Sequence, residues 1–324
     1  MRNTCLRIVD LLGDGEFVSG ALLGESLGVS RTTVWKHLAK LEEWGVPIEK
    51  TRGRGYRITG GMELLVKHQV HGAISKPALQ LLDRLEVLDT TESTNNVVRG
   101  EIEKGSAKGF VCFSERQTGG RGRHGREWVS PFGCNIYMSL SWHFDGGAAE
   151  LEGLSLAVGV AVARVLESFG VDNLSLKWPN DILLDKKKVG GILLEMMGDP
   201  IGECQVIVGV GINLGMTDGR SIDQAWADLS SCSKIRRNAL AGALITKLLP
   251  MLDAYSEQGF LAYREEWESF DAYRNAPIKL ITPRQTVRGL GRGISPTGAI
   301  RIEVDGAVES YSGGEISLRS DDDS

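Results

Sequence analysis

The sequence predicts an α+β protein with three domains in series and a short tail. Helical periodicity dominates residues 1–60, strand-like and helix-like segments mix over residues 61–273, and short strand-like runs separated by turn residues fill residues 274–318. A chain of 324 residues is long enough for two or three domains of ordinary size. Residues 319–324 include Asp321-Asp322-Asp323, which predicts a disordered acidic tail.

Charge is distributed unevenly along the chain, whose formal net charge is −5. Residues 1–60 hold nine Lys/Arg and seven Asp/Glu, a net +2, and the remaining residues hold 28 and 35, a net −7. This balance excludes a protein that coats nucleic acid along its whole length. It leaves room for a DNA-contacting module within the first 60 residues.

Cysteine usage and hydropathy both point to the cytoplasm. The five cysteines are widely scattered and include no CxxC pair, which disfavours a disulfide framework and a zinc site. The N-terminus lacks the apolar core of a signal peptide. The longest apolar stretch, residues 154–166, is interrupted by Ser155 and Arg164 and is too polar to span a bilayer. We therefore expect a cytoplasmic protein with no membrane partner.

Residues 1–60 are predicted to begin with three helices. An apolar repeat over residues 6–12 predicts a first helix that ends near Gly13. Ser19 is a candidate N-cap of a second helix, and Gly28 permits a sharp turn after it. Ser30 is a candidate N-cap of a third helix, whose apolar residues recur at i, i+4 and i+7 and predict a buried stripe: Val34, Leu38 and Leu41.

The third helix and the segment after it are basic. Residues 30–57 hold seven Lys/Arg and three Asp/Glu, and two short extended runs flank a glycine turn at Gly53, which predicts a β-hairpin. The arrangement resembles a winged helix-turn-helix DNA-binding domain; the alternative is a protein-interaction module with a solvated basic face. The residues expected to contact DNA are Arg31, Thr32, Thr33, Lys36, Arg52 and Arg54. Gly60-Gly61 is expected to be the hinge to the next domain.

Residues 120–128 form a glycine-spaced, arginine-rich loop, Gly-Arg-Gly-Arg-His-Gly-Arg-Glu-Trp. Positions 120–125 satisfy the GxGxxG pattern of dinucleotide-binding loops. Such a loop must open a helix, whereas residues 130–133 continue as Ser-Pro-Phe-Gly and residues 135–140 alternate as a strand. The context excludes a dinucleotide site. An RNA-binding loop is disfavoured because the surrounding domain is acidic and offers no aromatic stacking platform.

A second motif, Lys-Trp-Pro-Asn-Asp at residues 177–181, is predicted to be a turn between two short strands. Ordinary turn chemistry would account for Asn180 and Asp181. The lysines at 186–188 then predict a hairpin turn into a strand over residues 189–195, and a solvated hairpin is the simplest interpretation of Lys186 and Lys187.

Polar residues also follow two other predicted strands. Residues 87–91 read as a strand that leads into Ser93-Thr94-Asn95, where helix capping alone would explain the hydroxyl groups. Residues 206–214 form an apolar strand whose glycines permit close backbone approach, and the strand contains Asn213 near its end. Helices are predicted over residues 239–256 and 260–270.

The cations of the two motifs suit a reaction in which two anions meet. In adenylation a carboxylate attacks the α-phosphate of ATP, and negative charge builds on the phosphoryl oxygens. Fixed guanidinium and ammonium groups stabilise that charge, and removing one such donor typically costs roughly 3–4 kcal/mol. Glycines 119, 120, 122 and 125 would let the loop backbone close over the ligand.

The order and spacing of these motifs are similar to the active-site signatures of biotin protein ligases. The resemblance covers essentially the whole chain and is nearest to the bifunctional members that also repress the biotin operon. It implies a winged helix-turn-helix domain at 1–60, a mixed-sheet α/β ligase domain of the class II synthetase and lipoate-ligase type at 61–273, and an SH3-like β-barrel at 274–318, where four short strands alternate with turns.

The resemblance also implies an activity and partners. Biotin and ATP would give biotinoyl-5'-AMP and pyrophosphate with Mg²⁺ present, and biotin would pass to a lysine of the biotin carboxyl carrier protein of acetyl-CoA carboxylase. The adenylate would favour a homodimer that binds operator DNA of biotin biosynthesis genes. Three rivals stay open: a lipoate-type acyl ligase, a ligase whose N-terminal domain does not bind DNA, and a repressor that only senses biotin.

The site residues implied by the resemblance fall into three overlapping groups. Lys188 aligns with the family lysine that meets the biotin carboxylate and the phosphate, while Asp181 either orients that lysine or contacts Mg²⁺. The catalytic group is Arg123, Arg126, Lys177, Asp181 and Lys188. The biotin group is Ser93, Thr94, Asn95, Gln117, Gly120, Arg121, Gly122, Arg123, Lys188 and Gly191. The ATP and adenylate group is Arg123, Arg126, Trp128, Asn180, Asn213 and Trp226.

Overall fold

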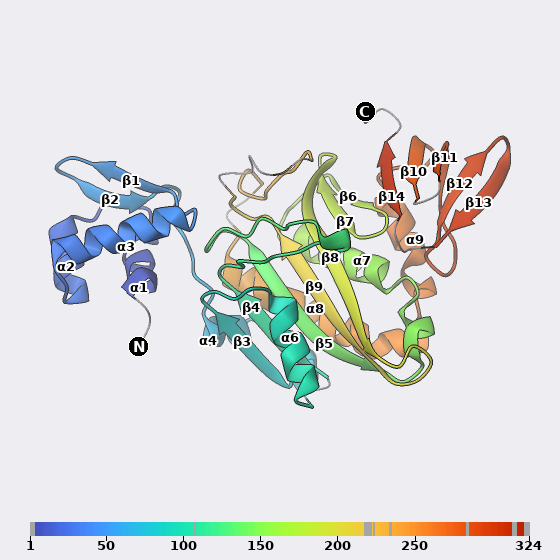
Figure 1. Ribbon diagram of the computed structural model, residues 1–324, viewed down its shortest axis with the longest axis horizontal. Coiled ribbons are helices and arrows are strands. Elements are labelled where there is room, and N and C mark those ends of the chain that lie inside the picture. The colour runs from blue at the N-terminus through green and yellow to red at the C-terminus, as the bar shows by residue number, and fades with distance from the viewer. Residues whose placement is uncertain are drawn as a thin grey trace.

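The computed structural model describes residues 4–105, 108–216, 222, 224–232, 235–282, 285–312 and 316–320. Three regions of secondary structure follow one another along the chain, as Figure 1 shows: a helical group with a small hairpin, a central sheet with helices, and a C-terminal sheet. The α+β prediction and its order of regions are therefore confirmed at this level. The predicted tail residues 321–324 lie outside the described part of the chain.

The N-terminal region is a helix-turn-helix with a following hairpin. Ser19 Oγ accepts a hydrogen bond from Leu22 N at 3.1 Å, and Ser30 Oγ accepts one from Thr33 N at 3.2 Å, so both predicted caps are confirmed. Gly28 has φ 69°, in the left-handed region that favours glycine. The elements are α1 (Thr4–Leu12), α2 (Gly20–Leu27), α3 (Arg31–Glu43), β1 (Ile48–Thr51) and β2 (Gly55–Ile58), with β1 and β2 antiparallel.

A residue from far along the chain completes the core of this region. The predicted stripe of α3 packs inward, and Phe132, which lies between the arginine-rich loop and the central sheet, is fully buried in the same cluster. Its ring lies 5.2 Å from that of Trp44, and Phe132 N donates to Trp44 O at 3.0 Å. The helix-turn-helix and the segment that follows the arginine-rich loop therefore share one hydrophobic core.

The linker between the first two regions is bonded to both of them. At Gly60-Gly61, which the sequence predicts as the hinge to the next domain, a Cβ on Gly61 would lie 2.7 Å from Gly13 O, and Met62 N donates to the same oxygen at 2.9 Å. Further along, Val66 N donates to Asn238 Oδ1 at 2.7 Å. The two glycines thus make a tight turn against α1, because their positive φ angles of 82° and 76° permit it.

The central region is a seven-stranded mixed sheet in the order β3-β4-β5-β9-β8-β7-β6, in which only β3 and β4 run parallel. Helices α7 and α8 pack on one face, and α6 lies on the other, in front of the sheet in Figure 1. The strands are β3 (Arg84–Leu88), β4 (Phe110–Ser114), β5 (Ile136–Phe144), β6 (Leu174–Lys177), β7 (Asp181–Leu184), β8 (Lys187–Gly198) and β9 (Cys204–Ile212). The helices are α4 (Lys67–Gly72), α5 (Lys76–Leu81), α6 (Thr94–Glu103), α7 (Leu154–Ser168), α8 (Arg237–Gln258) and α9 (Leu261–Phe270), with short 3-10 turns at Arg123–Gly125 and Gly147–Leu151.

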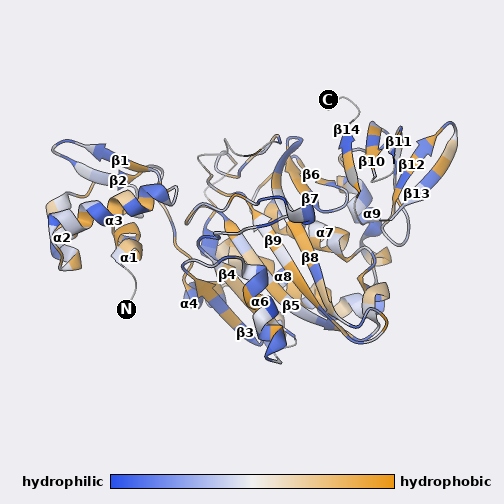
Figure 2. Ribbon diagram, viewed as in Figure 1, coloured by the Kyte–Doolittle hydropathy of each residue, from blue (hydrophilic) through white to orange (hydrophobic). Residues whose placement is uncertain are grey.

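Apolar residues of the central strands bury the sheet against the α7 and α8 layer. Figure 2 shows hydrophobic colouring along β5, β8 and β9. In β9, Val206, Val208, Val210 and Ile212 belong to the large core cluster, while the intervening residues point to the opposite face. Among the described residues, no helix is both long enough and apolar enough to traverse a bilayer.

The C-terminal region is an antiparallel sheet in the order β13-β12-β11-β10-β14. The predicted SH3-like barrel would need the two edge strands to meet, and within the described residues no pairing joins β13 to β14, so the sheet is open there. The strands are β10 (Pro277–Ile281), β11 (Thr286–Ile294), β12 (Ile300–Val304), β13 (Ala307–Tyr311) and β14 (Ser317–Ser320). β14 includes residues 319 and 320, which the sequence assigns to the tail.

Candidate active site

Three glycines on one face of β8 and β9 form the base of the site. A Cβ on Gly211 would lie 2.7 Å from the ring of Trp128, and one on Gly209 would lie 2.5 Å from Asn95 Oδ1. Gly191 pairs with Gly211 in the sheet and approaches both Trp128 and Lys188. We call Gly191, Gly209 and Gly211 the glycine face. Because these positions lack side chains, polar groups from other segments can lie directly on the sheet.

The Ser93-Thr94-Asn95 segment lies over this face at the start of α6. Ser93 occupies the N-cap position without a side-chain capping bond, so capping does not explain it. All three residues are at least 95% buried. Thr94 Oγ1 lies 2.6 Å from Ser139 Oγ, and Ser139 Oγ donates to Asn95 Oδ1 at 2.6 Å. Asn95 Nδ2 is buried and has no hydrogen-bond acceptor in the protein, so this amide group is an unsatisfied donor beside the glycine face.

Gln117 and Gly120 connect this polar cluster to the arginine-rich loop. Gln117 Oε1 accepts from Thr94 N at 2.9 Å, and Gln117 Nε2 donates to Ser130 Oγ at 3.2 Å. Gly120 fits where a Cβ would lie 2.6 Å from Ser130 Oγ and from Trp128 O. The predicted biotin-group residues of both segments therefore meet through a continuous set of hydrogen bonds.

The arginine-rich loop folds back on itself and opens no helix. Gly122 N donates to Arg126 O at 2.8 Å, and Trp128 N donates to Gly120 O at 2.9 Å, closing a hairpin-like turn around a single 3-10 turn. This confirms the exclusion of a dinucleotide-type loop. Of the loop glycines, Gly125 has φ 69°, whereas a Cβ on Gly122 would meet nothing closer than 3.8 Å.

Lys188 and Asp181 form a largely buried ion pair beside the glycine face. Their Nζ and Oδ1 atoms are 2.6 Å apart, and the side chains are 17% and 14% exposed. The two residues meet because β7 and β8 pair around a two-residue turn at Asp185 and Lys186, both of which adopt positive φ. Lys188 Nζ also lies 5.4 Å above the ring of Trp128, a cation–π contact.

Arg123 approaches the same carboxylate from the loop. Burial lowers the pKa of the Arg123 guanidinium, nearby Asp181 raises it, and Arg126 lowers it. Arg123 Nη2 also donates to Ile316 O at 3.4 Å, so the C-terminal region contacts the loop. The structure thus brings Arg123 and Lys188, from two separate turns, to the surroundings of one carboxylate. Such a site has an excess of positive charge with which to meet an anion.

The other two loop arginines have different surroundings. Arg121 donates to Glu195 Oε1 at 3.2 Å and to Asn96 Oδ1 at 2.7 Å, so its charge is matched within the protein and it anchors the loop. Arg126 is exposed. Of the three loop arginines that the sequence offers as fixed positive charge, Arg121 is therefore paired with a carboxylate of the protein, whereas Arg126 is exposed to solvent.

The remaining predicted residues lie around the ion pair with mainly structural bonds. Lys177 pairs with Asp181 across β6 and β7. Asn180 Nδ2 donates to Ile192 O at 2.7 Å, and Asn213 Nδ2 donates to Ala227 O at 3.1 Å. Trp226 is half-buried where its segment pairs with the Lys188 backbone, and it lines an open pocket of about 310 Å³ with Leu184, Asp185, Lys187, Ala227, Asp228 and Ser231.

Several residues of the site were missed from the sequence. Ser139 is a buried hydroxyl in the middle of the apolar strand β5, and Glu195 is a carboxylate in the middle of the apolar strand β8. A polar residue inside an apolar strand is visible in the sequence, and it indicates a buried side chain that needs a hydrogen-bond partner. Trp128 belongs to the predicted ATP and adenylate group, and its Nε1 is a second buried donor that lacks an acceptor in the protein.

Most of the predicted DNA-contacting residues of the N-terminal region are exposed. Arg31, Thr32 and Lys36 on α3 are exposed, as are Arg52 and Arg54 in the hairpin, while Thr33 is half-buried. The guanidinium of Arg54 lies 4.1 Å from the ring centre of Phe17, which supports the hairpin tip.

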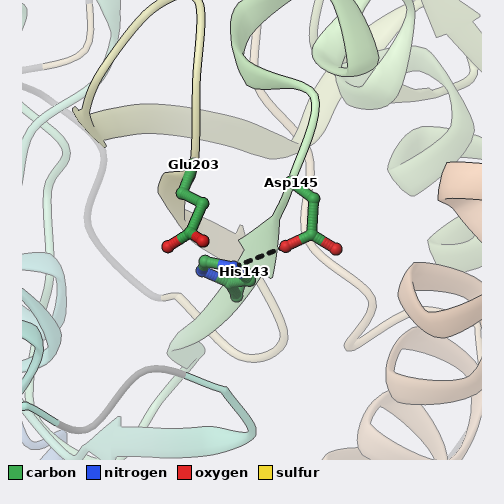
Figure 3. A group of neighbouring side chains, drawn as sticks. All are labelled: His143, Asp145 and Glu203. Atoms are coloured by element: carbon green, nitrogen blue, oxygen red, sulfur yellow. Dashed lines mark hydrogen bonds and ion pairs between the residues drawn. The ribbon is translucent and has the colours of Figure 1, made fainter.

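One group of metal-ligating residues lies among the described residues, and it is remote from this site. Figure 3 shows His143, Asp145 and Glu203, whose ligand atoms all lie within 4.8 Å of one another. Six positions of β5 separate His143 from Tyr137, which pairs with Gly211, a distance of about 20 Å along a strand. Asp145 and Glu203 are exposed, and the group is separated from the glycine face by that length of β5.

Comparisons with known proteins agree along the whole chain. Residues 87–213 match the biotin/lipoate A/B protein ligase family, residues 5–57 match a helix-turn-helix domain, and residues 275–319 match the biotin protein ligase C-terminal domain. The chain is 38% identical to the bifunctional ligase/repressor BirA of Escherichia coli, over 97% of each chain, and 29% identical to that of Bacillus subtilis, over 98% of this chain and all of the relative. A solved biotin protein ligase from Aquifex aeolicus, in complex with biotin and ATP, is 28% identical with a TM-score of 0.64, over 74% of this chain and all of that one.

Proposed function

The chain belongs to the family of bifunctional biotin ligases and repressors, and we propose that the residues around Lys188 perform its chemistry: ATP-dependent activation of biotin and transfer to a carrier-protein lysine. The observation that supports these site roles is the approach of Arg123 and Lys188 to one carboxylate, Asp181. Two cations held beside one largely buried carboxylate suit a reaction that joins two anions.

The biotin ring is proposed to lie on the glycine face under the start of α6. A ureido ring has two N–H donors and one carbonyl acceptor, all of which need partners when they leave water. Asn95 Nδ2 offers a donor to the carbonyl, and the hydroxyl groups of Ser93 and Thr94 offer acceptors to the N–H groups. A buried donor without an acceptor costs about 1–3 kcal/mol, so a ligand carbonyl at Asn95 would remove a penalty that the protein alone retains.

The first step joins the biotin carboxylate to the α-phosphorus of ATP. A carboxylate oxygen attacks that phosphorus, the bond to the bridging oxygen breaks, and pyrophosphate leaves with the electron pair. Lys188 and Arg123 would stabilise the charge on the phosphoryl oxygens, while Asp181 fixes the position of the Lys188 ammonium group. Arg126, Trp128, Asn213 and Trp226 are proposed to contact the nucleotide.

The second step transfers the acyl group. The uncharged amine of a lysine on the carrier protein attacks the carbonyl carbon of the mixed anhydride, AMP leaves, and the new amide nitrogen loses a proton. The reaction needs no nucleophile from the enzyme. Catalysis would therefore depend on holding the anhydride away from water, a role that we assign to the loop of residues 120–128.

Magnesium is proposed as a partner of ATP and not as a resident metal. Mg²⁺ commonly binds through one or two carboxylates together with substrate phosphates, and Asp181 could contribute one such oxygen beside Lys188. Bound there, Mg²⁺ would neutralise phosphate charge.

Exchange of labelled pyrophosphate into ATP tests the first step. We expect exchange that depends on biotin and not on lipoate, and biotinylation of a carrier domain detected by mass spectrometry. Exchange that depends on lipoate would assign the chain to the lipoate-type acyl ligases. Carrier biotinylation would also exclude a protein that only senses biotin.

The N-terminal region is proposed to bind operator DNA of biotin biosynthesis genes as a homodimer in the cytoplasm, with biotinoyl-AMP favouring the dimer. The exposed cations of α3 and of the β1–β2 hairpin support this proposal. Gel shifts with biotin-gene promoter DNA, with and without biotin plus ATP, test it; absence of a shift under both conditions would leave a ligase that does not bind DNA. We retain as finer proposals a class II synthetase relationship for the central sheet and an SH3-like relationship for the C-terminal sheet.

A further inference from the structure

Trp35 has no structural role that accounts for its presence on α3. Its side chain is 56% exposed, and it is the only aromatic residue among those described that is more than about a third exposed. Among the described residues, the Trp35 side chain makes no hydrogen bond and no ring contact. Trp44, at the end of the same helix, differs: its ring contacts Phe132 at 5.2 Å and Lys40 Nζ at 5.0 Å. One tryptophan holds two domains together, and the other faces solvent.

The position of Trp35 is fixed by the rest of the helix. The buried residues of α3, Val34, Leu38 and Leu41, turn one side of the helix into the core, and Trp35 lies outside that stripe. It follows Arg31 by one helical turn and precedes Lys36. It therefore lies in the N-terminal half of the second helix of the helix-turn-helix, the part that meets base edges in a major groove.

The surroundings of Trp35 favour a polyanion as its partner. The exposed residues nearest in sequence include Arg31, Lys36 and Lys40, and the exposed Arg52 and Arg54 stand in the adjoining hairpin. A groove for an apolar peptide would show apolar neighbours, and this face shows cations. An exposed aromatic side chain on a helix that also carries exposed cations is complementary to DNA, where phosphates flank the groove that holds the apolar thymine methyl groups.

We propose that Trp35 is a specificity-determining residue that packs on the 5-methyl group of a thymine in the major groove. The proposal rests on DNA binding by the N-terminal region as proposed above, and it adds which base is read and by which side chain. Cation–phosphate contacts position the protein without reading sequence, so base selection needs groups such as this one. An indole offers a large rigid apolar surface at a small entropic cost.

The test is a selection from a randomised duplex DNA library by the full-length protein with biotin and ATP. We expect the wild-type protein to select a thymine that Trp35→Ala no longer selects. Replacing that thymine by uracil, which lacks only the methyl group, should weaken wild-type binding about tenfold and leave Trp35→Ala binding unchanged. The salt dependence of binding should be the same for both proteins, because no phosphate contact is lost.

Two controls separate the possible failures. Arg54→Ala should weaken binding to all sequences and lower the salt slope by about one, and Leu261→Ala, an exposed apolar truncation on α9, should change nothing. A Trp35→Ala variant that unfolds normally and selects the wild-type sequence overturns the role of Trp35 alone. A wild-type protein that selects no sequence overturns DNA binding itself, and Trp35 with it.

Discussion

The residues that determine the helix-turn-helix lie close together in the sequence, whereas those that form the candidate active site come from distant segments. In the first, the determinants are local: Ser19 and Ser30 cap the helices that they precede, and Gly28 makes the turn between them. In the second, Asn95, Trp128 and Lys188 come from three segments and meet over the glycine face. The difference teaches that a short motif reports its own conformation, whereas a site depends on what the sheet brings beside it.

The largest expected effect is a loss of stability when Phe132, which joins the N-terminal core to the loop segment of the central region, is replaced. Phe132→Ala removes a fully buried ring from the N-terminal core, and we expect a loss of about 3–5 kcal/mol in the free energy of unfolding. Thermal and denaturant unfolding would measure it. The exposed residue Leu261 provides the control, since Leu261→Ala should stay within about 0.5 kcal/mol. Equal stability of both variants would show that the shared core contributes little.

The assembled site should fail when one of its cations is removed. Lys188→Ala is expected to slow pyrophosphate release by roughly 10²–10³-fold, because about 3–4 kcal/mol of charge stabilisation is lost. The matched control is Lys187→Ala, which removes the exposed neighbouring lysine. Lys188→Met, which keeps the apolar part of the side chain, distinguishes loss of charge from loss of packing. Wild-type rates in Lys188→Met would contradict the assignment.

The carboxyl group of Asp271, at the end of α9, should make the stability of the protein depend on pH. Burial raises the pKa of Asp271, which pairs with Leu176 where α9 ends, from 3.8 to about 6. The folded state therefore favours the protonated form, and stability falls as pH rises from about 4 through about 6. We expect Asp271→Asn to stabilise the protein at pH 8, by at most about 3 kcal/mol, and to lose that gain below about pH 4. Unfolding midpoints measured against pH would check this, and a gain that grows on acidification would contradict it.

The smallest effect tests the local side of the comparison. Ser30→Ala removes the cap of α3 and should cost about 1 kcal/mol, with pyrophosphate release unaltered. Ser19→Ala should behave alike, since its cap has the same geometry. A large loss of ligase activity in either variant would mean that the caps act on the distant site.

The sequence was sufficient wherever a rule acts over a few residues. The caps and the rejection of a dinucleotide loop follow from local chemistry. The hairpin turn was expected at residues 186–188, whereas the structure has it at Asp185 and Lys186, and Lys187 and Lys188 already belong to β8. The closeness of Arg123 and Lys188 followed from the family resemblance, because two turns 65 positions apart carry no local sign of contact.

Other features depend on partners that a linear pattern does not name. Gly13 O packs against the turn at Gly60-Gly61, and Glu195 on β8 forms an ion pair with Arg121. The barrel expected for the last strands requires pairing between edges, which strand patterns do not encode. Ser139 had a signal, a hydroxyl in an apolar strand, but its partner Asn95 is known only from the fold.

The hydrogen bonds that hold the linker between the first two regions bear on the half-site spacing of the DNA that the protein can bind. Glu115, in an ion pair with Arg237 at 2.7 Å, also accepts from Leu65 N, so the residues joining the two regions are secured on the catalytic side as well as at Gly13. In the proposed dimer, each helix-turn-helix region would be held in a fixed orientation relative to its central region by this linker. One added base pair between half-sites rotates the second by about 34–36°, which regions held in this way would not follow, so the repressor should be intolerant of altered spacer length.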